Sequence, residues 1–193
     1  MTRESIEGAL AEQADVMARV AREMVPQIEA VAAAVLDTVR SDGKLLLCGN
    51  GGSAADAQHL AAEFVVRLSR DRQPIAAIAL TADTSVLTAG GNDLGFAHVF
   101  ERQVQALGRP GDLLILLSTS GRSENLRRAA GAARVAGVRT VALLAKGGGP
   151  LCAEVDLPLV VPTDSTARAQ EAHITIGHVV CEIVDRSFSG PGA

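Results

Sequence analysis

A histidine and a glutamate stand four residues apart within residues 45–67, which read LLLCGNGGSAADAQHLAAEFVVR. Residues at this spacing share one face of a helix, so the His59 imidazole and the Glu63 carboxylate are predicted to point the same way. Side chains of these two types can act as a base toward a bound ligand. A surface His–Glu pair without a chemical role has the same spacing, and this stretch alone does not separate the two interpretations.

A glycine-rich turn directly precedes this predicted helix. Gly49, Gly51 and Gly52 carry no Cβ, so the backbone can approach a ligand closely, and Ser53 occupies the predicted N-cap. Exposed N–H groups and the positive end of the helix dipole would favour a phosphate there. The turn matches neither GxGxxG nor the lysine-bearing P-loop, so a nucleotide is not the first expectation. A tight strand-to-helix turn without a ligand is the alternative.

A second loop carries a sharper phosphate signal. It reads Ser118-Thr119-Ser120-Gly121-Arg122-Ser123 and stands between an apolar run and a predicted helix. Hydroxyl donors and free backbone N–H groups at a helix start, without a lysine, suit a phosphomonoester. The alternative is an over-supplied helix cap, because an N-cap needs only one such hydroxyl. Arg122 is given no role.

Histidines also recur on the last predicted helix, after Gln170. By spacing alone His173, three residues from Gln170, is the easier partner for that side chain, whereas His178 lies eight residues away. A histidine among isoleucines and valines is more often a core or surface residue than a functional one. The spacing therefore does not select a functional histidine here.

Length and composition limit the classes of protein. A chain of 193 residues fits one domain that buries roughly 70% of its unfolded surface. The net charge of −4 without a basic block argues against nucleic acid, while small anionic ligands remain possible. Cys48, Cys152 and Cys181 form no CxxC pair and are predicted to be reduced core residues. The N-terminus lacks a hydrophobic signal core and the apolar runs are too short to span a bilayer, so we expect a cytoplasmic protein without a membrane segment.

Alternating strands and helices predict a doubly wound α/β sheet. Short apolar strands are expected at residues 44–48, 75–80, 113–117, 139–145 and 157–161, with a closing helix over 166–188 and a loose tail over 189–193. Asn92 and Asp93 are predicted to lie in a turn before a helix at 96–107. Ligands of such sheets bind beyond the carboxyl ends of the strands, where both loops fall.

Two helices, at residues 5–23 and about 27–39, precede the first strand and are interrupted at Pro26. Their apolar stripes lie outside any βα unit. We expect this N-terminal helical hairpin, residues 1–40, to be covered by a subunit partner, and residues 41–188 to form the α/β sandwich of a single domain.

Taken together, the motifs resemble the phosphoheptose isomerases, a branch of the sugar isomerase (SIS) domain proteins. The similarity covers nearly the whole chain, including the N-terminal helices. Five motifs occur in the family's order: Cys48-Gly49-Asn50-Gly51-Gly52-Ser53, the His59 and Glu63 pair, Gly91-Asn92-Asp93, residues 118–123, and Gln170-Glu171-Ala172-His173 with His178. One position differs from the family pattern: Ala167 stands where some members have Asp, and the nearest acidic residue is Asp164.

The resemblance implies a flavodoxin-like SIS fold and a homotetrameric aldose-ketose isomerase. Its reaction converts sedoheptulose 7-phosphate to D-glycero-D-manno-heptose 7-phosphate through an enediolate, the first step of heptose nucleotide biosynthesis. The family's base and acid fall on Glu63 and His178, and its ligands for one Zn²⁺ per subunit fall on His59, Glu63, Gln170 and His178. Its substrate contacts fall on Asn50, Gly51, Gly52, Ser53, Glu63, Asn92, Asp93, Ser118, Thr119, Ser120, Ser123 and Gln170.

Two consequences follow from helix geometry and from the roles that the family assigns. Gln170 and His178 are roughly 12 Å apart along one helix, so we expect either a site completed across a subunit interface or an irregular helix start near Gln170. If Glu63 binds the metal it is a weaker base, and the two roles compete.

The alternatives are a tetrameric SIS scaffold that binds the bacterial replication initiator and an isomerase for another sugar phosphate. The scaffold proteins lack the Glu and the second His of the isomerase, and both Glu63 and His178 are present here. The enzyme is therefore the favoured interpretation.

Overall fold

A five-stranded parallel sheet forms the centre of the molecule. The structure is a computed structural model of the chain and describes residues 2–189. The strands are β1 (Leu45–Gly49), β2 (Ala77–Ala79), β3 (Leu113–Ser118), β4 (Arg139–Leu144) and β5 (Leu157–Val160), in the spatial order β2-β1-β3-β4-β5 with every pair parallel. The predicted doubly wound parallel sheet is thus confirmed. The second strand is shorter than expected, because it lies at the edge and is only partly buried.

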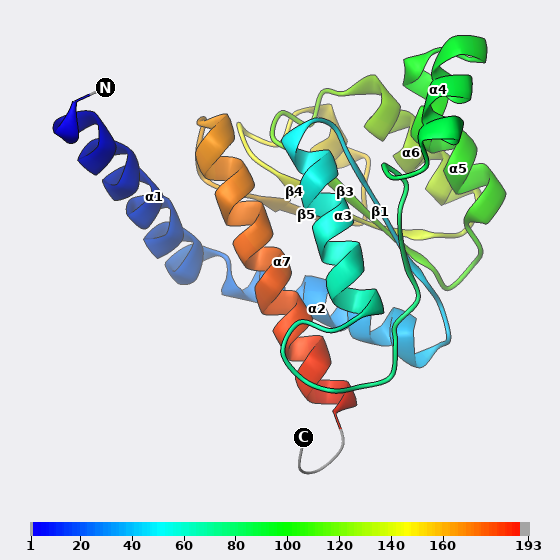
Figure 1. The fold of residues 1–193 in the computed structure, drawn as a ribbon, viewed down its shortest axis with the longest axis horizontal. Helices are drawn as coiled ribbons and strands as arrows, with labels where there is room; N and C mark the ends of the chain where they lie inside the picture. Colours follow the sequence, from blue (N-terminus) through cyan, green and yellow to red (C-terminus); the bar gives the residue numbers. More distant parts are fainter. Residues whose placement is uncertain (1, 190–193) are drawn as a thin grey trace.

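Helices cover both faces of this sheet (Figure 1). They are α1 (Arg3–Glu23), α2 (Val25–Arg40), α3 (Gly52–Val65), α4 (Thr84–Asp93), α5 (Val99–Leu107), α6 (Glu124–Val135) and α7 (Thr166–Phe188), with short 3-10 turns η1 (Phe96–His98) and η2 (Pro150–Ala153).

Alternation along the strands divides the core between the two faces. Leu45 and Leu47 pack with α2, α3 and α7 on one side, whereas Leu46 and Cys48 pack with α5 and α6 on the other. Successive side chains of a strand point to opposite faces, and all four are fully buried, as expected for a parallel sheet covered on both sides. Among residues 2–189, no helix combines the length and apolar composition needed to cross a membrane.

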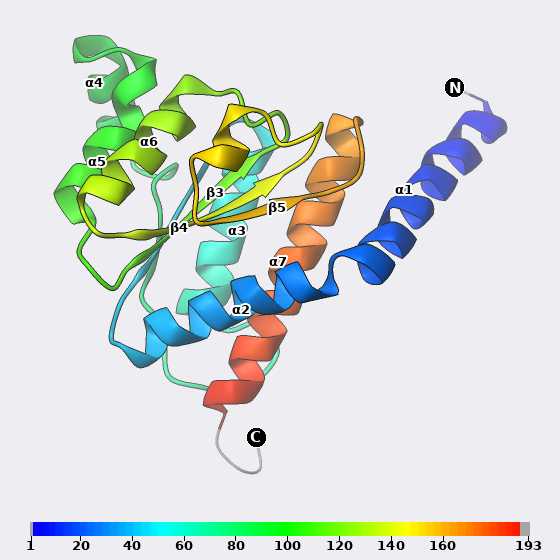
Figure 2. The ribbon, with the colours of Figure 1, turned by 180° about the vertical axis from the view of Figure 1, so that it is seen from behind.

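The two N-terminal helices do not fold back on each other as a closed hairpin. Helix α2 follows α1 after the break at Met24 and packs across α7 and the sheet, while α1 extends away from the domain (Figure 2). Only the last turns of α1, at Val16 and Val20, are buried, whereas Leu10 is 67% exposed. A contact from α7 holds α1 in place, because Arg168 donates a hydrogen bond to the Ala9 carbonyl.

One predicted boundary is wrong. Asn92 and Asp93 are the last residues of α4 rather than a turn, because the helical bonding continues through the glycines and the Leu94 N–H still reaches the Gly90 carbonyl. Glycine inside a helix costs only about 1 kcal/mol, so Gly90 and Gly91 did not end the helix. Of the predicted tail at 189–193, all but Ser189 lies outside the described residues.

The strand order creates a switch point between β1 and β3. From β1 the chain crosses to β2 on one side, and it then returns to β3 on the other side. Gly49 at the end of β1 pairs with Leu117 near the end of β3, so the loops that follow both strands emerge side by side at one edge of the sheet. Ligands of open α/β sheets bind at such a crevice.

Candidate active site

Three side chains that could do chemistry converge between α3 and α7. The Nε2 atoms of His59 and His178 are 2.8 Å apart, and His59 Nε2 lies 3.4 Å from a Glu63 carboxylate oxygen. One ligand atom from each of the three lies within 4.8 Å of the others. The His59 side chain is 48% exposed and that of Glu63 is 17% exposed, so a substrate or a metal ion can reach them. The predicted helical pair and the distant His178 thus share one site.

A glycine at the helix contact brings the two histidines together. Helices α3 and α7 run side by side in the same direction (Figure 1). A Cβ on Gly177 would lie 2.5 Å from a methyl carbon of Leu60, which is closer than such atoms approach. Gly177 and Leu60 are the chain neighbours of His178 and His59, so the close helix packing directly sets the distance between the imidazoles.

The glycine turn begins α3 in a different way from the prediction. Gly51 is the N-cap residue, with φ of 56°, and its carbonyl accepts hydrogen bonds from the N–H groups of Ala54 and Ala55. Ser53 lies inside the helix and is buried, so its prediction as the N-cap is wrong. The positive φ explains the glycine at 51, since other residues rarely adopt it.

Gln170 lies against this turn. A Cβ on Gly52 would be 2.5 Å from the Gln170 side-chain nitrogen, so the missing side chain is what makes room for the amide. Helix α7 is regular from Thr166 onward, with Ser165 capping it at the Arg168 N–H, and an irregular start near Gln170 is therefore excluded. Gln170 lies ~12 Å along the helix from His178. Its role as a metal ligand stays a prediction, and so does completion of the site across a subunit interface.

A reciprocal amide pair joins the two loops. Asn50 donates to Asn125 Oδ1 at 3.0 Å, and Asn125 donates back to Asn50 Oδ1 at 2.9 Å. Asn125 is buried in the first turn of α6. Sequence reasoning singled out Asn50 but missed Asn125, because nothing in the local pattern marks a partner 75 residues away.

The serine-rich loop is shaped by its own hydroxyls. Ser118 Oγ accepts from the Gly121 N–H at 3.0 Å, and Ser120 Oγ accepts from the Arg122 N–H at 3.3 Å. Ser123 occupies the N-cap position of α6 but makes no side-chain capping bond. Thr119, Ser120 and Ser123 are partly exposed, so this hydroxyl-rich helix start is accessible to an anion.

Asn92 and Asp93 come from a different element, helix α4. They are exposed at the end of α4, where Asn92 donates to the Asp93 carboxylate at 2.6 Å. Helix α4 stands apart from α3 and α7 in Figure 1. Their substrate contacts remain a prediction.

Known proteins share both the sequence and this fold. The family model of the SIS domain matches residues 10–145. A phosphoheptose isomerase from Roseiflexus sp. is 57% identical over 90% of this chain and 88% of its own length, and one from Geotalea daltonii is 46% identical over 97% of both chains. The chain belongs to the phosphoheptose isomerase family of SIS domain proteins. It is therefore an isomerase.

Solved structures of the family have the same architecture. A phosphoheptose isomerase from Neisseria gonorrhoeae superposes with a TM-score of 0.91 at 43% identity, covering 95% of this chain and 98% of its own. One from Francisella tularensis gives a TM-score of 0.93 at 36% identity, covering 96% and 100%. The α/β sheet with its N-terminal helices is thus the fold of phosphoheptose isomerases.

Burial separates His173 from the site. His173 is fully buried and its Nε2 lies 3.0 Å from the Leu144 carbonyl, to which it donates in the neutral form. Burial lowers the pKa of His173 below its usual value. Of the two histidines of α7, His178 is the one that lies beside His59 on α3.

The buried His173 makes stability depend on pH. The pKa of His173 is lower in the folded state than the unfolded value of about 6.5, so above that pH the residue is neutral in both states and its contribution to the free energy of unfolding is complete. As the pH falls from there toward the folded pKa, the unfolded state takes up a proton first, and this contribution is lost. We expect His173→Met to reduce the fall in Tm between about pH 7.5 and about pH 5.5, measured by differential scanning calorimetry. An equal pH dependence of wild type and His173→Met would contradict this role.

Asp56 is an acidic neighbour that sequence reasoning missed. It lies one turn before His59 on α3, and one of its carboxylate oxygens is buried without a hydrogen-bond partner. Burial raises the pKa of Asp56, and the nearby His59 partly offsets this effect. The three-residue spacing to His59 was the available signal.

Position 167, where this chain has Ala and some family members have Asp, is exposed. Ala167 lies on the first turn of α7 and Asp164 precedes the helix, both with exposed side chains. In this member the helix start therefore has Ser165 as its cap and no acid at 167.

Proposed function

We propose that the protein is an aldose-ketose isomerase that converts sedoheptulose 7-phosphate to D-glycero-D-manno-heptose 7-phosphate through an enediolate, as the first step of heptose nucleotide biosynthesis. The observation that carries the proposal is the convergence of Glu63 on α3 with His178 on α7, where α3 begins at the first of the two turns proposed to bind the phosphate. The names of the related phosphoheptose isomerases support the heptose substrate.

The residue types supply the two proton transfers that the reaction needs. Glu63, as the base, takes a proton from C1 of the ketose and returns it to C2, which moves the carbonyl between these carbons. His178 gives a proton to the oxygen on C2 and accepts one from the oxygen on C1. Protons and electrons balance, because the ketose and the aldose have the same composition.

The separation of the two sites suits an open-chain sugar phosphate. His59 lies seven residues beyond Gly52 on α3, which is roughly 10 Å along the helix axis. The phosphate would bind at the N–H groups and hydroxyls of residues 50–53 and 118–123, while the extended carbon chain reaches toward His59, Glu63 and His178. The loops thus hold the unreactive end of the substrate.

The three convergent residues fit a zinc ion. Two imidazole nitrogens and a carboxylate oxygen, each free to turn toward a common point, are a donor set typical of Zn²⁺. We propose that His59, Glu63 and His178 hold one ion per subunit with Gln170 as a further ligand, and that bound zinc stabilises negative charge developing on the substrate oxygens.

Removing zinc should abolish turnover. We expect a chelator to lower the rate of sedoheptulose 7-phosphate isomerisation by at least about 100-fold and added Zn²⁺ to restore it, because the transition-state charge loses its counter-ion. The measurement is product formation by purified protein, with chelator already saturated by zinc as the control. Full turnover after chelation would contradict the zinc proposal. Turnover only on a shorter sugar phosphate would contradict the proposed substrate. No turnover, together with tight binding to the replication initiator, would favour the scaffold function.

We further propose a homotetramer in the cytoplasm. The extended α1 presents the apolar side chains of Ile6 and Leu10 to solvent, which favours a subunit partner on this helix. All three cysteines are free thiols, as is typical of a reducing compartment.

A further inference from the structure

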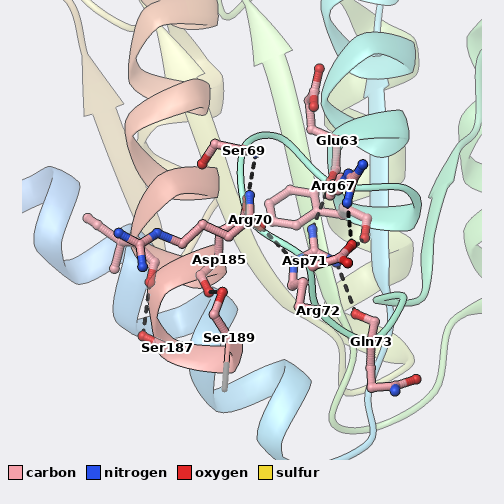
Figure 3. A network of polar contacts seen from close by, with 12 residues as sticks. Glu63, Arg67, Ser69, Arg70, Asp71, Arg72, Gln73, Asp185, Ser187 and Ser189 are labelled. Atoms are coloured by element: carbon pink, nitrogen blue, oxygen red, sulfur yellow. Dashed lines mark hydrogen bonds and ion pairs between the residues drawn. The ribbon is translucent and has the colours of Figure 1, made fainter. Parts of the chain in front are cut away.

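A fully buried ion pair lies below the reactive side chains. Arg72 donates through Nε to the Asp185 carboxylate at 2.6 Å, and neither side chain is exposed. Asp185 also accepts from the N–H groups of Ser69 at 2.9 Å and Arg70 at 3.2 Å (Figure 3). These bonds hold the pKa of the Asp185 carboxyl below its usual value, despite the opposing effect of burial. The loop after α3 is thereby attached to α7.

The other side of the same guanidinium caps α3. Arg72 Nη2 donates to the Glu63 carbonyl at 2.8 Å, and Nη1 donates to the Phe64 carbonyl at 2.8 Å. Carbonyls in the last turn of a helix have no partner within the helix. One rigid, planar cation therefore satisfies the end of α3 and, through Asp185, connects it to α7.

The two attachment points lie close to the reactive side chains. Arg72 bonds the backbone of Glu63 itself, while the Glu63 side chain points away from the ion pair along α3 (Figure 3). On α7, Asp185 lies seven residues after His178, two turns along nearly the same face. The pair thus fixes the axial register of the base against that of the acid.

We propose that Arg72 and Asp185 are positioning residues that hold Glu63 against His178 by clamping the last turn of α3 to α7. The inference rests on the proposed function and names two residues beyond those that contact substrate or metal. Packing alone does not require the pair, because an apolar pair of similar volume is often as stable as a buried ion pair. What an apolar pair does not supply is a set of directed bonds to the Glu63 and Phe64 carbonyls.

A matched aspartate allows the test to separate positioning from stability. Asp112 also accepts from two backbone N–H groups and one cation, namely Lys44 N at 2.9 Å, Arg109 N at 2.8 Å and Lys44 Nζ at 2.5 Å. Its pKa is likewise lowered by these partners. Asp112 precedes β3, at the opposite edge of the sheet from the loops that bind substrate.

We expect both Asp185→Asn and Asp112→Asn to lower Tm, but only Asp185→Asn to lower kcat, by about 10- to 100-fold. KM should change little, because the phosphate-binding turns lie at the other end of α3. Arg72→Lys keeps the charge but not the planar fork, so it should lose kcat like Asp185→Asn. The double variant Arg72→Met with Asp185→Leu leaves no unpaired buried charge, so it should regain part of the lost Tm without recovering kcat.

Cobalt binding provides a readout that does not depend on turnover. Co²⁺ at the His59, Glu63 and His178 site would absorb visible light, and titration gives its affinity in each variant. We expect Asp185→Asn to weaken Co²⁺ binding by about 10- to 100-fold and Asp112→Asn to leave it unchanged. Equal effects of the two variants on kcat and on cobalt affinity, or full recovery of both in the apolar double variant, would overturn the clamp. If the wild type binds cobalt but isomerises no sugar phosphate, the proposed function fails while the cobalt comparison still tests the clamp.

Discussion

Replacing Glu63 with glutamine is expected to lower kcat by about 10²- to 10⁴-fold, the range found when a positioned general base is removed. Glutamine has nearly the same shape as glutamate but cannot accept a proton from carbon. The Glu63 carbonyl would keep its bond from Arg72, so the helix end should stay in place. KM should remain close to the wild-type value, because the phosphate is held elsewhere. Initial rates with sedoheptulose 7-phosphate, together with circular dichroism, would measure both effects.

A second glutamate provides the control for this substitution. Glu182 lies on α7, four residues after His178, and forms an exposed ion pair with Arg186. Exposed pairs contribute little, so Glu182→Gln should change neither kcat nor Tm appreciably. If Glu63→Gln retains the wild-type rate, the assignment of Glu63 as the base is wrong, whatever its role toward the metal.

Local sequence patterns were sufficient for the sheet and for two of the three converging side chains. Runs such as residues 113–117 are apolar at every position, which indicates a strand buried on both faces. The His59 and Glu63 pair follows from helical spacing, which depends only on backbone geometry. In both cases the information lies within one element.

The partner histidine could not be found in this way. His173 and His178 are five residues apart, so they point about 140° away from each other around the helix. Which of these two directions faces α3 depends on how α7 packs on the sheet, and that is decided by contacts such as Gly177 with Leu60. Spacing from Gln170 pointed to the buried histidine, whereas the family resemblance gave the one that lies beside His59.

Gln170 and Gly52 show the same limit in another form. The glycine was expected to let a ligand approach the backbone, yet its Cβ position is taken by the Gln170 amide. A glycine reports that space near the backbone is needed, but not what occupies that space. The pairing of Asn50 with Asn125, and of Arg72 with Asp185, likewise joins residues too far apart in the chain for local patterns to reveal.

Replacing Gly121 with alanine is expected to raise KM for the sugar phosphate by about 10- to 100-fold, the equivalent of losing one charge-assisted hydrogen bond. Gly121 has φ of +61°, and an added Cβ would lie 1.8 Å from the Gly148 carbonyl oxygen. Both are backbone constraints, so the loop must move. That movement would break the bond from the Gly121 N–H to Ser118 Oγ and displace the N–H groups that we propose bind the phosphate.

Gly131→Ala is the matched control, because Gly131 lies inside α6, which this loop begins, and has no atom within 4 Å of its Cβ position. There alanine should stabilise the fold by about 0.5–1 kcal/mol and leave KM unchanged. Protection by inorganic phosphate in thermal unfolding measures the same site without turnover, and Gly121→Ala should lose it. Since the clash is with backbone atoms, no side-chain rearrangement can relieve it. A Gly121→Ala enzyme with wild-type KM and wild-type phosphate protection would therefore mean that residues 118–123 do not bind the phosphate.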